Sequence, residues 1–204
     1  MKKITLIILG IVISLASFGQ TTQNSMVEYN KTNIPGVSIV VNGYSLDVVE
    51  KALKSRLEQI GGLKKGSSSK GFTIYQNQPF TDFGTQNYNV YTQLVFNKKI
   101  NTVTLNLLVD KGNNNFASPN TDPELVQKMS DFLTNFATTY LSEYDLNLKV
   151  EAQTTVVEKL TKECNSLTSD IEKLKKELSA KENSLSSKEA ALNKEKEALN
   201  ALKK

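Results

Sequence analysis

The stretch NVYTQLVFNKKINTVTLNLLV, residues 89–109, decides the fold of the chain. Apolar or β-branched side chains occupy every second position in both of its halves: Val90, Thr92, Leu94 and Phe96, then Val103, Leu105, Leu107 and Val109. A period of two is that of a strand with one buried face. The polar Asn97-Lys98-Lys99 segment between the halves is typical of a turn. The stretch therefore predicts an antiparallel hairpin.

Upstream of this hairpin, the sequence predicts a strand followed by a helix. The segment Val37–Val41 is apolar and mostly β-branched, and Asn42-Gly43 is a turn signal behind it. Ser45 is a candidate N-cap. Apolar residues then recur at three- and four-residue spacing: Leu46, Val49, Leu53, Leu57 and Ile60. Gly61-Gly62 ends the helix, because glycine adopts the left-handed conformation without steric penalty.

A polar region with an aromatic group separates that helix from the hairpin. Residues 64–71 include three consecutive serines and predict an exposed loop, and Phe72–Tyr75 predicts a short strand. Phe80, Phe83 and Tyr88 follow in a polar loop. Such rings can stack on a glycan or grip a peptide, or they can plug the end of the sheet. The sequence favours the plug, because large aromatic side chains are usually buried when a core is near, and the ligand contact remains the alternative.

A second helix follows the hairpin. Thr121 or Asp122 is its candidate cap, and Pro123 suits its first position, where a missing N–H costs nothing. Its inner face carries Leu125, Met129, Phe132, Phe136 and Tyr140. The predicted order β-α-β-β-β-α favours an α+β domain over residues 20–148, with two helices on one face of a largely antiparallel four-stranded sheet.

From Val150 onward the sequence predicts a coiled-coil helix, which we assign to residues 149–204. One row of side chains repeats every seven residues: Val150, Val157, Cys164, Ile171, Leu178, Leu185, Leu192 and Leu199. A second row lies three residues after members of the first: Leu160, Leu167 and Leu174. Two such rows form a supercoil seam. Beyond Leu178 the second row becomes Lys181, Lys188 and Glu195, which predicts weaker association.

The predicted helix is too long to be buried by its own domain. About 50 residues make a helix of about 75 Å, whereas a 120-residue head has a radius of gyration near 14 Å. Valine and isoleucine in one row with leucine in the other favour a parallel homodimer. A helix folded back near Ser184–Ser187, or one bound to another protein, remains an alternative. In a parallel pair Cys164 faces its own copy, either as a disulfide or as a reduced small hydrophobe.

The first 19 residues read as a secretory signal peptide. Lys2 and Lys3 precede an apolar run from Ile4 to Leu15, and the small Ser17 and Gly19 suit cleavage before Gln20. The run is shorter than the roughly 20 residues of a permanent span, although an uncleaved anchor is the alternative. No cysteine lies near the cleavage point, so a lipoprotein is not expected. The sequence predicts a periplasmic or secreted protein with no stable membrane span after cleavage.

The composition argues against several function classes. The chain has no His and one Cys, so the commonest general base and zinc ligand is missing. Without Lys2 and Lys3 the balance is 23 basic against 21 acidic residues, and Arg56 is the single arginine. This pattern does not favour nucleic-acid binding. The sequence offers no catalytic set, cofactor site or metal site, and we expect no enzyme.

A leader, a small Asn- and Lys-rich αβ domain and a Lys/Glu/Leu helix together resemble exported Bacteroidota-type proteins with a small αβ head and a C-terminal coiled coil. The resemblance covers layout and composition and implies no activity. The sequence favours a non-catalytic envelope protein, with a head on a self-associating rod, acting as scaffold, spacer or assembly factor, with an envelope protein as a further partner. The alternative is a glycan- or peptide-binding module that uses Phe80, Phe83 and Tyr88.

Overall fold

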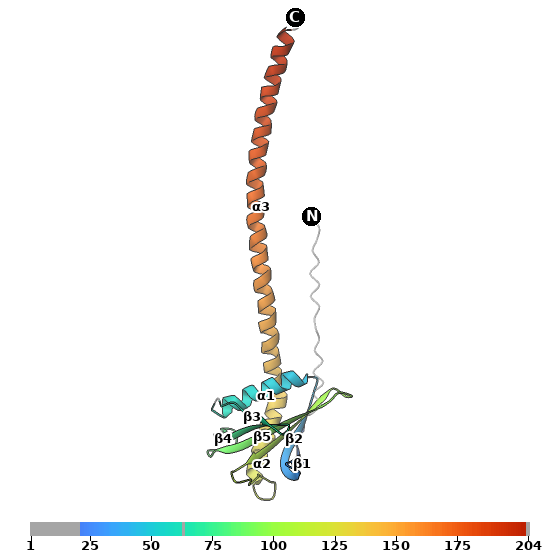
Figure 1. Ribbon diagram of the computed structural model, residues 1–204, viewed down its shortest axis with the longest axis vertical. Coiled ribbons are helices and arrows are strands. Elements are labelled where there is room, and N and C mark those ends of the chain that lie inside the picture. Colours follow the sequence, from blue (N-terminus) through green and yellow to red (C-terminus); the bar gives the residue numbers. More distant parts are fainter. Residues whose placement is uncertain (1–20, 63, 203–204) are drawn as a thin grey trace. The chain divides into compact units, whose positions relative to one another are not determined.

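The computed structural model of the chain describes residues 21–62 and 64–202 and shows an α+β fold (Figure 1). The predicted signal peptide lies outside the described residues. The strands are β1 (Gln23–Tyr29), β2 (Thr32–Asn42), β3 (Ser67–Ser69), β4 (Phe72–Gln78), β5 (Tyr88–Asn97) and β6 (Thr102–Asp110). The helices are α1 (Leu46–Ile60), α2 (Pro123–Asn135), the π-helical turn η1 (Phe136–Tyr140) and α3 (Leu141–Leu202).

The strands form one antiparallel sheet in the order β1-β2-β6-β5-β4-β3. The predicted hairpin is confirmed as β5–β6 and lies within the sheet, with strands on both sides of it. Its last pair is Asn97 with Thr102, so the loop covers residues 98–101. The predicted strand at residues 37–41 is confirmed within β2, and that at residues 72–75 within β4.

The prediction of four strands is wrong, because the sheet has six. The two additional strands, β1 and β3, are the edge strands. Each joins its neighbour through a two-residue turn in which both residues have positive φ: Asn30-Lys31 and Lys70-Gly71. This backbone geometry matches the twist of paired strands and closes tight hairpins. The polar residues 67–69, predicted as loop, therefore become a strand through their pairing with β4.

One face of the sheet packs against α1 and α2 to form the main core. Inward-facing residues of β2, β5 and β6 supply its sheet side, and the predicted apolar faces of both helices cover them. The Ser45 hydroxyl accepts a hydrogen bond from the Val48 backbone N–H at 3.4 Å, which confirms the predicted N-cap. The helix ends at Ile60, and Gly62 adopts a φ of +78°, as the glycine pair predicts.

The opposite face of the sheet carries a second, smaller core that the sequence did not indicate. It consists of Val27, Phe72, Ile74, Tyr91 and Leu108. The Tyr29 ring of β1 lies 5.2 Å from the ring of Phe72 in β4, between centroids. The Lys70 ammonium also donates a hydrogen bond to the Asn30 side-chain oxygen, so the tips of the two edge hairpins meet. The sheet is therefore strongly curled.

Gly36 permits this curl at a close contact between β2 and β6. A Cβ atom on Gly36 would lie 2.3 Å from the Leu108 Cδ2 atom and 2.8 Å from the Leu107 carbonyl oxygen. Neither distance is compatible with van der Waals contact. A residue without a side chain is therefore required where the strand bends over the smaller core.

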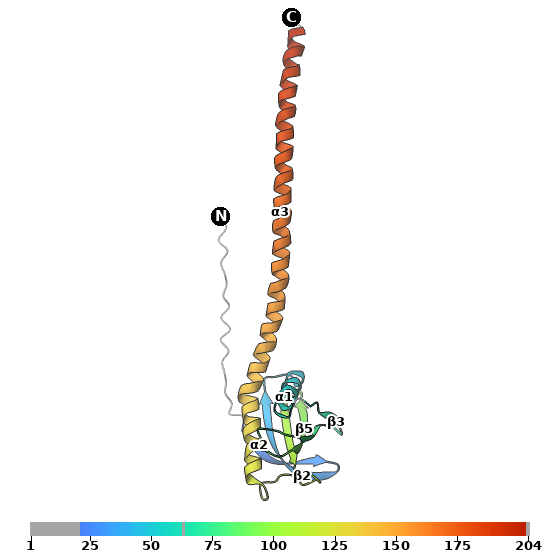
Figure 2. The same cartoon turned by 90° about the vertical axis from the view of Figure 1, so that its left-hand side faces the viewer.

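The second helix begins as predicted, with Asp122 at the N-cap position and Pro123 at the first position. It does not end before the heptad segment. Instead, α2, η1 and α3 follow one another as a continuous helix (Figure 2). Buried residues recur here at an uninterrupted spacing of four: Leu125, Met129, Leu133, Ala137 and Leu141. Because an α-helix needs some spacings of three to hold one face, the wider π-helical turn keeps this row over the core.

The internal contacts of the chain divide it into two units, one ending at Leu146 and the other beginning at Asn147. The first unit contains the sheet, both cores and the start of α3. The second unit is helical throughout residues 147–202, and every one of these residues is exposed. Within residues 21–62 and 64–202, no helix combines the length and apolar character needed to cross a bilayer.

Candidate functional site

The predicted seam forms a line of exposed apolar side chains on α3. The exposed fraction of the following side chains lies between 51% and 62%: Val150, Val157, Leu160, Leu167, Ile171, Leu174, Leu178, Leu185, Leu192 and Leu199. Cys164, which occupies the same row as Val157 and Ile171, is also exposed. Since soluble proteins rarely expose large contiguous apolar patches, this stripe is a candidate interaction surface.

Two further leucines continue the second row and were missed by the sequence reasoning. Leu146 lies two heptads before Leu160, and Leu202 lies four heptads after Leu174. Both are exposed. The signal was present in the spacing, but the polar Gln153 interrupts the row after Leu146, and charged residues interrupt it before Leu202.

Three threonines flank the first half of the seam at heptad spacing. The hydroxyls of Thr154, Thr161 and Thr168 each donate a hydrogen bond to the backbone carbonyl oxygen four residues earlier, at 2.8–2.9 Å. Their hydroxyls are thus satisfied within the helix. What these residues present to a neighbouring helix is mainly a methyl group, so they widen the apolar stripe without needing a polar partner.

The second half of the seam differs chemically from the first. Beside the leucine row, the second row there consists of Lys181, Lys188 and Glu195, all exposed. In an in-register parallel pair each of these residues would face its own copy, and like charges at a seam are unfavourable. The two-row apolar surface is therefore concentrated between Leu146 and Leu178, and we call this part the proximal seam.

The structure places the predicted aromatic ligand contacts in the main core. Phe80, Phe83 and Tyr88 are at most 6% exposed. The Phe83 ring contacts the Phe80, Tyr88 and Phe132 rings, with centroid distances of 5.7, 6.4 and 5.4 Å. The structure does not favour a direct contact of these rings with a glycan or peptide, because all three are buried and Phe83 packs against Phe132 of α2. They act as the plug that the sequence favours.

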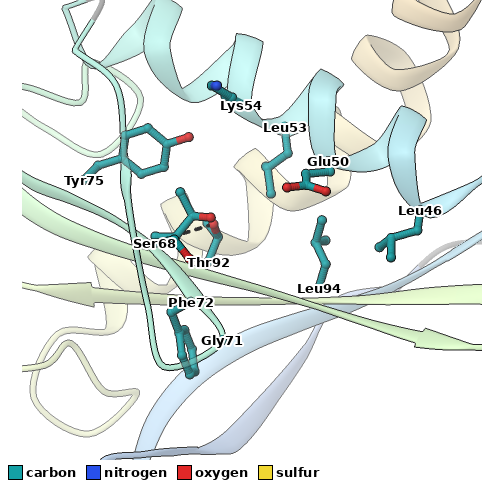
Figure 3. A pocket seen from close by; sticks show the side chains of 11 residues that line it. Leu46, Glu50, Leu53, Lys54, Ser68, Gly71, Phe72, Tyr75, Thr92 and Leu94 are labelled. Carbon is teal, nitrogen blue, oxygen red and sulfur yellow. Dashed lines mark hydrogen bonds between the residues drawn. The ribbon is translucent and has the colours of Figure 1, made fainter.

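A pocket that the sequence did not reveal lies between α1 and strands β3–β5 (Figure 3). Its volume is about 220 Å³. Leu46, Glu50, Leu53 and Lys54 line it from α1, while Ser68, Thr73, Tyr75, Thr92 and Leu94 are among the residues that line it from the sheet. Glu50 and Lys54 are exposed at its rim. The pocket therefore combines an apolar wall with hydroxyl groups and two opposite charges.

The Tyr75 phenol remains protonated at physiological pH. Burial raises its pKa to about 12, and the negative charge of Glu58 adds to the effect. Figure 3 shows the hydroxyl directed toward the interior of the pocket. A neutral phenol in this place can donate a hydrogen bond. The pocket could not be predicted from the sequence, because it depends on which residues of β3, β4 and β5 lie opposite one another.

Within the described ranges, no group of three or more His, Cys, Asp or Glu side chains is arranged to hold a metal ion. Comparisons of the chain with protein-family models, with curated proteins and with solved structures gave no match. The resemblance to exported Bacteroidota-type proteins is thus untested and remains a prediction.

Proposed function

We propose that this chain is a non-catalytic protein of the cell envelope that forms a parallel homodimer through α3 and displays its α+β unit as a scaffold, spacer or assembly factor. Export is proposed from the leader sequence in residues 1–19, and the non-catalytic role from a composition without His and with a single Cys, which lies in α3. The exposed stripe on α3 is the observation that carries the proposal.

The energetics of the stripe favour a partner helix. Each Val, Leu or Ile left in water forgoes roughly 1.5–3 kcal/mol relative to full burial. The first row runs without interruption from Val150 to Leu199, and its valine, isoleucine and leucine side chains are more than half exposed in the single chain. Pairing two copies along the proximal seam would bury both rows at once.

The side-chain types support two parallel helices. The first row of the proximal seam contains Val150, Val157 and Ile171, whereas the second contains leucines. β-branched residues in the first row with leucine in the second favour parallel dimers over higher oligomers. The three flanking threonines, whose hydroxyls are already bonded within the helix, add no charge that would oppose this pairing.

The fold-back alternative near Ser184–Ser187 has no support in the backbone. These residues lie inside α3, which extends from Leu141 to Leu202 as one helix. A hairpin would require a turn at this point. A partner helix from a second chain therefore remains the better way to cover the stripe.

Light scattering on the chain that begins at Gln20 tests the proposal directly. We expect a molar mass of about twice that of one chain at tens of micromolar, eluting as a single species. The physical reason is the burial of the proximal seam, which two copies achieve and one does not. A mass equal to that of one chain at this concentration would overturn the homodimer.

Cys164 reports the orientation and register of the two helices. Because it is the only cysteine, any oxidised dimer must join Cys164 to its own copy. In a parallel in-register pair the two sulfur atoms face each other, so we expect mild oxidation with copper–phenanthroline to give mainly covalent dimer on non-reducing gels. Thiol reduction should restore the monomer band. A protein that is dimeric by light scattering but is not crosslinked would contradict the parallel register.

A further inference from the structure

The floor of the pocket between α1 and the sheet is a row of hydroxyl side chains. Ser68 of β3 lies opposite Thr73 of β4, and Thr73 lies opposite Thr92 of β5. The same row continues on β6 with Leu107, which is fully buried in the main core. On this face of the sheet, β3, β4 and β5 therefore carry hydroxyl side chains in a row that is apolar on β6.

Thr92 shows that this polar floor is not merely solvent-exposed surface. Its side chain is only 4% exposed. Its hydroxyl donates to the Thr73 backbone carbonyl at 3.5 Å, which is at the long limit for a hydrogen bond. A buried hydroxyl with such a weak partner retains the capacity to bond to a molecule that enters the pocket.

The rim carries two opposite charges that do not neutralise each other. Glu50 and Lys54 lie one turn apart on α1 and line the pocket. Opposite charges at this spacing usually attract, and Asp47 and Lys51 on the same helix do form an ion pair, at 2.9 Å. Across the part of the chain that the structure describes, neither Glu50 nor Lys54 makes an ion pair or a hydrogen bond. Figure 3 shows the Glu50 carboxylate at the rim, between α1 and Leu94.

The size and the remaining wall restrict the ligand. A volume of about 220 Å³ is small beside the roughly 300–1,000 Å³ of pockets for drug-sized molecules. Leu53 and Leu94 provide an apolar wall for a short side chain. The floor hydroxyls and the neutral Tyr75 phenol can donate to a carboxylate, and Lys54 supplies a positive charge at the rim. The Glu50 carboxylate can accept hydrogen bonds from an ammonium group.

We propose that this pocket binds a small zwitterion with adjacent ammonium and carboxylate groups, namely a free α-amino acid with a short side chain. The ammonium contacts Glu50, the carboxylate contacts Lys54 and the floor hydroxyls, and the side chain packs on Leu53 and Leu94. The pocket lies wholly in the unit that ends at Leu146. The proposal is therefore independent of association through α3 and can fail or hold separately from it.

Titration of the ¹⁵N-labelled chain with glycine, L-alanine and D-alanine tests the proposal by NMR. We expect saturable shifts of the backbone amides of Thr73 and Thr92 for at least one of them in the millimolar range. N-acetyl-alanine, which lacks the ammonium, and alaninamide, which lacks the carboxylate, should each bind about three- to tenfold more weakly, since each loses one charged contact. Equal binding of the blocked and free forms, or no saturable shift, would overturn the proposal.

Charge-neutralising variants locate the binding. Glu50→Gln should weaken alanine binding by about three- to tenfold and remove the preference over N-acetyl-alanine. Lys54→Met should likewise weaken alanine binding by about three- to tenfold, and it should remove the preference for alanine over alaninamide. Asp47→Asn and Lys51→Met are matched controls, because they neutralise a pair with the same spacing on the same helix that does not line the pocket; they should leave binding unchanged. Equal losses in the controls would mean that overall charge, and not this pocket, determines binding.

Discussion

We expect the replacement of Leu160 and Leu167 with lysine to convert the proposed dimer to a monomer at tens of micromolar. Both leucines lie in the second row of the proximal seam, and both are exposed in the single chain. In the proposed dimer the double variant removes four buried leucines, each worth roughly 1.5–3 kcal/mol, or roughly 6–12 kcal/mol together. This corresponds to an increase in the dissociation constant of at least about 10⁴-fold. Light scattering measures the change as a halved molar mass.

A matched control separates the seam from the general effect of added charge. Thr155→Lys with Ser169→Lys adds the same two positive charges to each chain. Thr155 and Ser169 lie on the side of α3 opposite the seam, at heptad positions five after the first row. This variant should remain dimeric. Dissociation of both double variants would point to charge repulsion, and dissociation of neither would mean that the proximal seam is not the interface.

Replacing Phe83 with alanine lowers the free energy of unfolding by about 3–5 kcal/mol. The Phe83 side chain is 1% exposed, and its ring contacts Phe80 and Tyr88 in the sheet region and Phe132 on α2. Removing the ring leaves a cavity where the loop, the sheet and α2 meet, because the surrounding side chains relax only partly. Urea denaturation followed by circular dichroism gives the change.

Thr85→Ala serves as the control for this loop, because Thr85 is exposed two residues from Phe83. It should change the unfolding free energy by no more than about 0.5 kcal/mol. If Phe83→Ala also had an effect below about 1 kcal/mol, the ring would not be buried in solution. The interpretation of Phe80, Phe83 and Tyr88 as a ligand contact would then regain its basis.

The sequence predicts those elements whose formation depends on local signals. The alternation of residues 89–109 predicts β5 and β6, and the combination of Ser45, a three-four apolar spacing and Gly61-Gly62 predicts α1 with both of its ends. Pro123 marks the start of α2. In each of these cases the hydrophobic period and the residues at the boundaries indicate the same type of element. The element can therefore be predicted without information from distant parts of the chain.

The edge strands and the continuous helix were missed because their signals are not local. The serines of β3 have no apolar period, and they form a strand only because β4 lies beside them and the Lys70-Gly71 turn closes the hairpin. The η1 turn is visible in the sequence only as a row spaced by four from Leu125 to Leu141. The spacing indicates a π-helical turn only when it is known that all residues of the row are buried on the same side of the helix.

The two candidate sites differ in how far the sequence could reveal them. The seam is a property of one helix, so its repeat of seven identifies it without knowledge of the fold. The pocket depends on the pairing of Ser68 with Thr73 and of Thr73 with Thr92, which the register of three strands determines. The burial of Phe83 likewise depends on Phe132, which is distant in the sequence.

The short edge strand β3 also affects how copies of this chain behave when they are crowded. An exposed edge can recruit a strand from another molecule and so begin aggregation. At this edge, an incoming strand would find only three residues for pairing, all of them serine. The hydrogen bond between Lys70 and Asn30 also ties the adjoining turn to the opposite hairpin. This edge is therefore a poor template for intermolecular sheet growth, which suits a chain whose helix is expected to bring two copies close together.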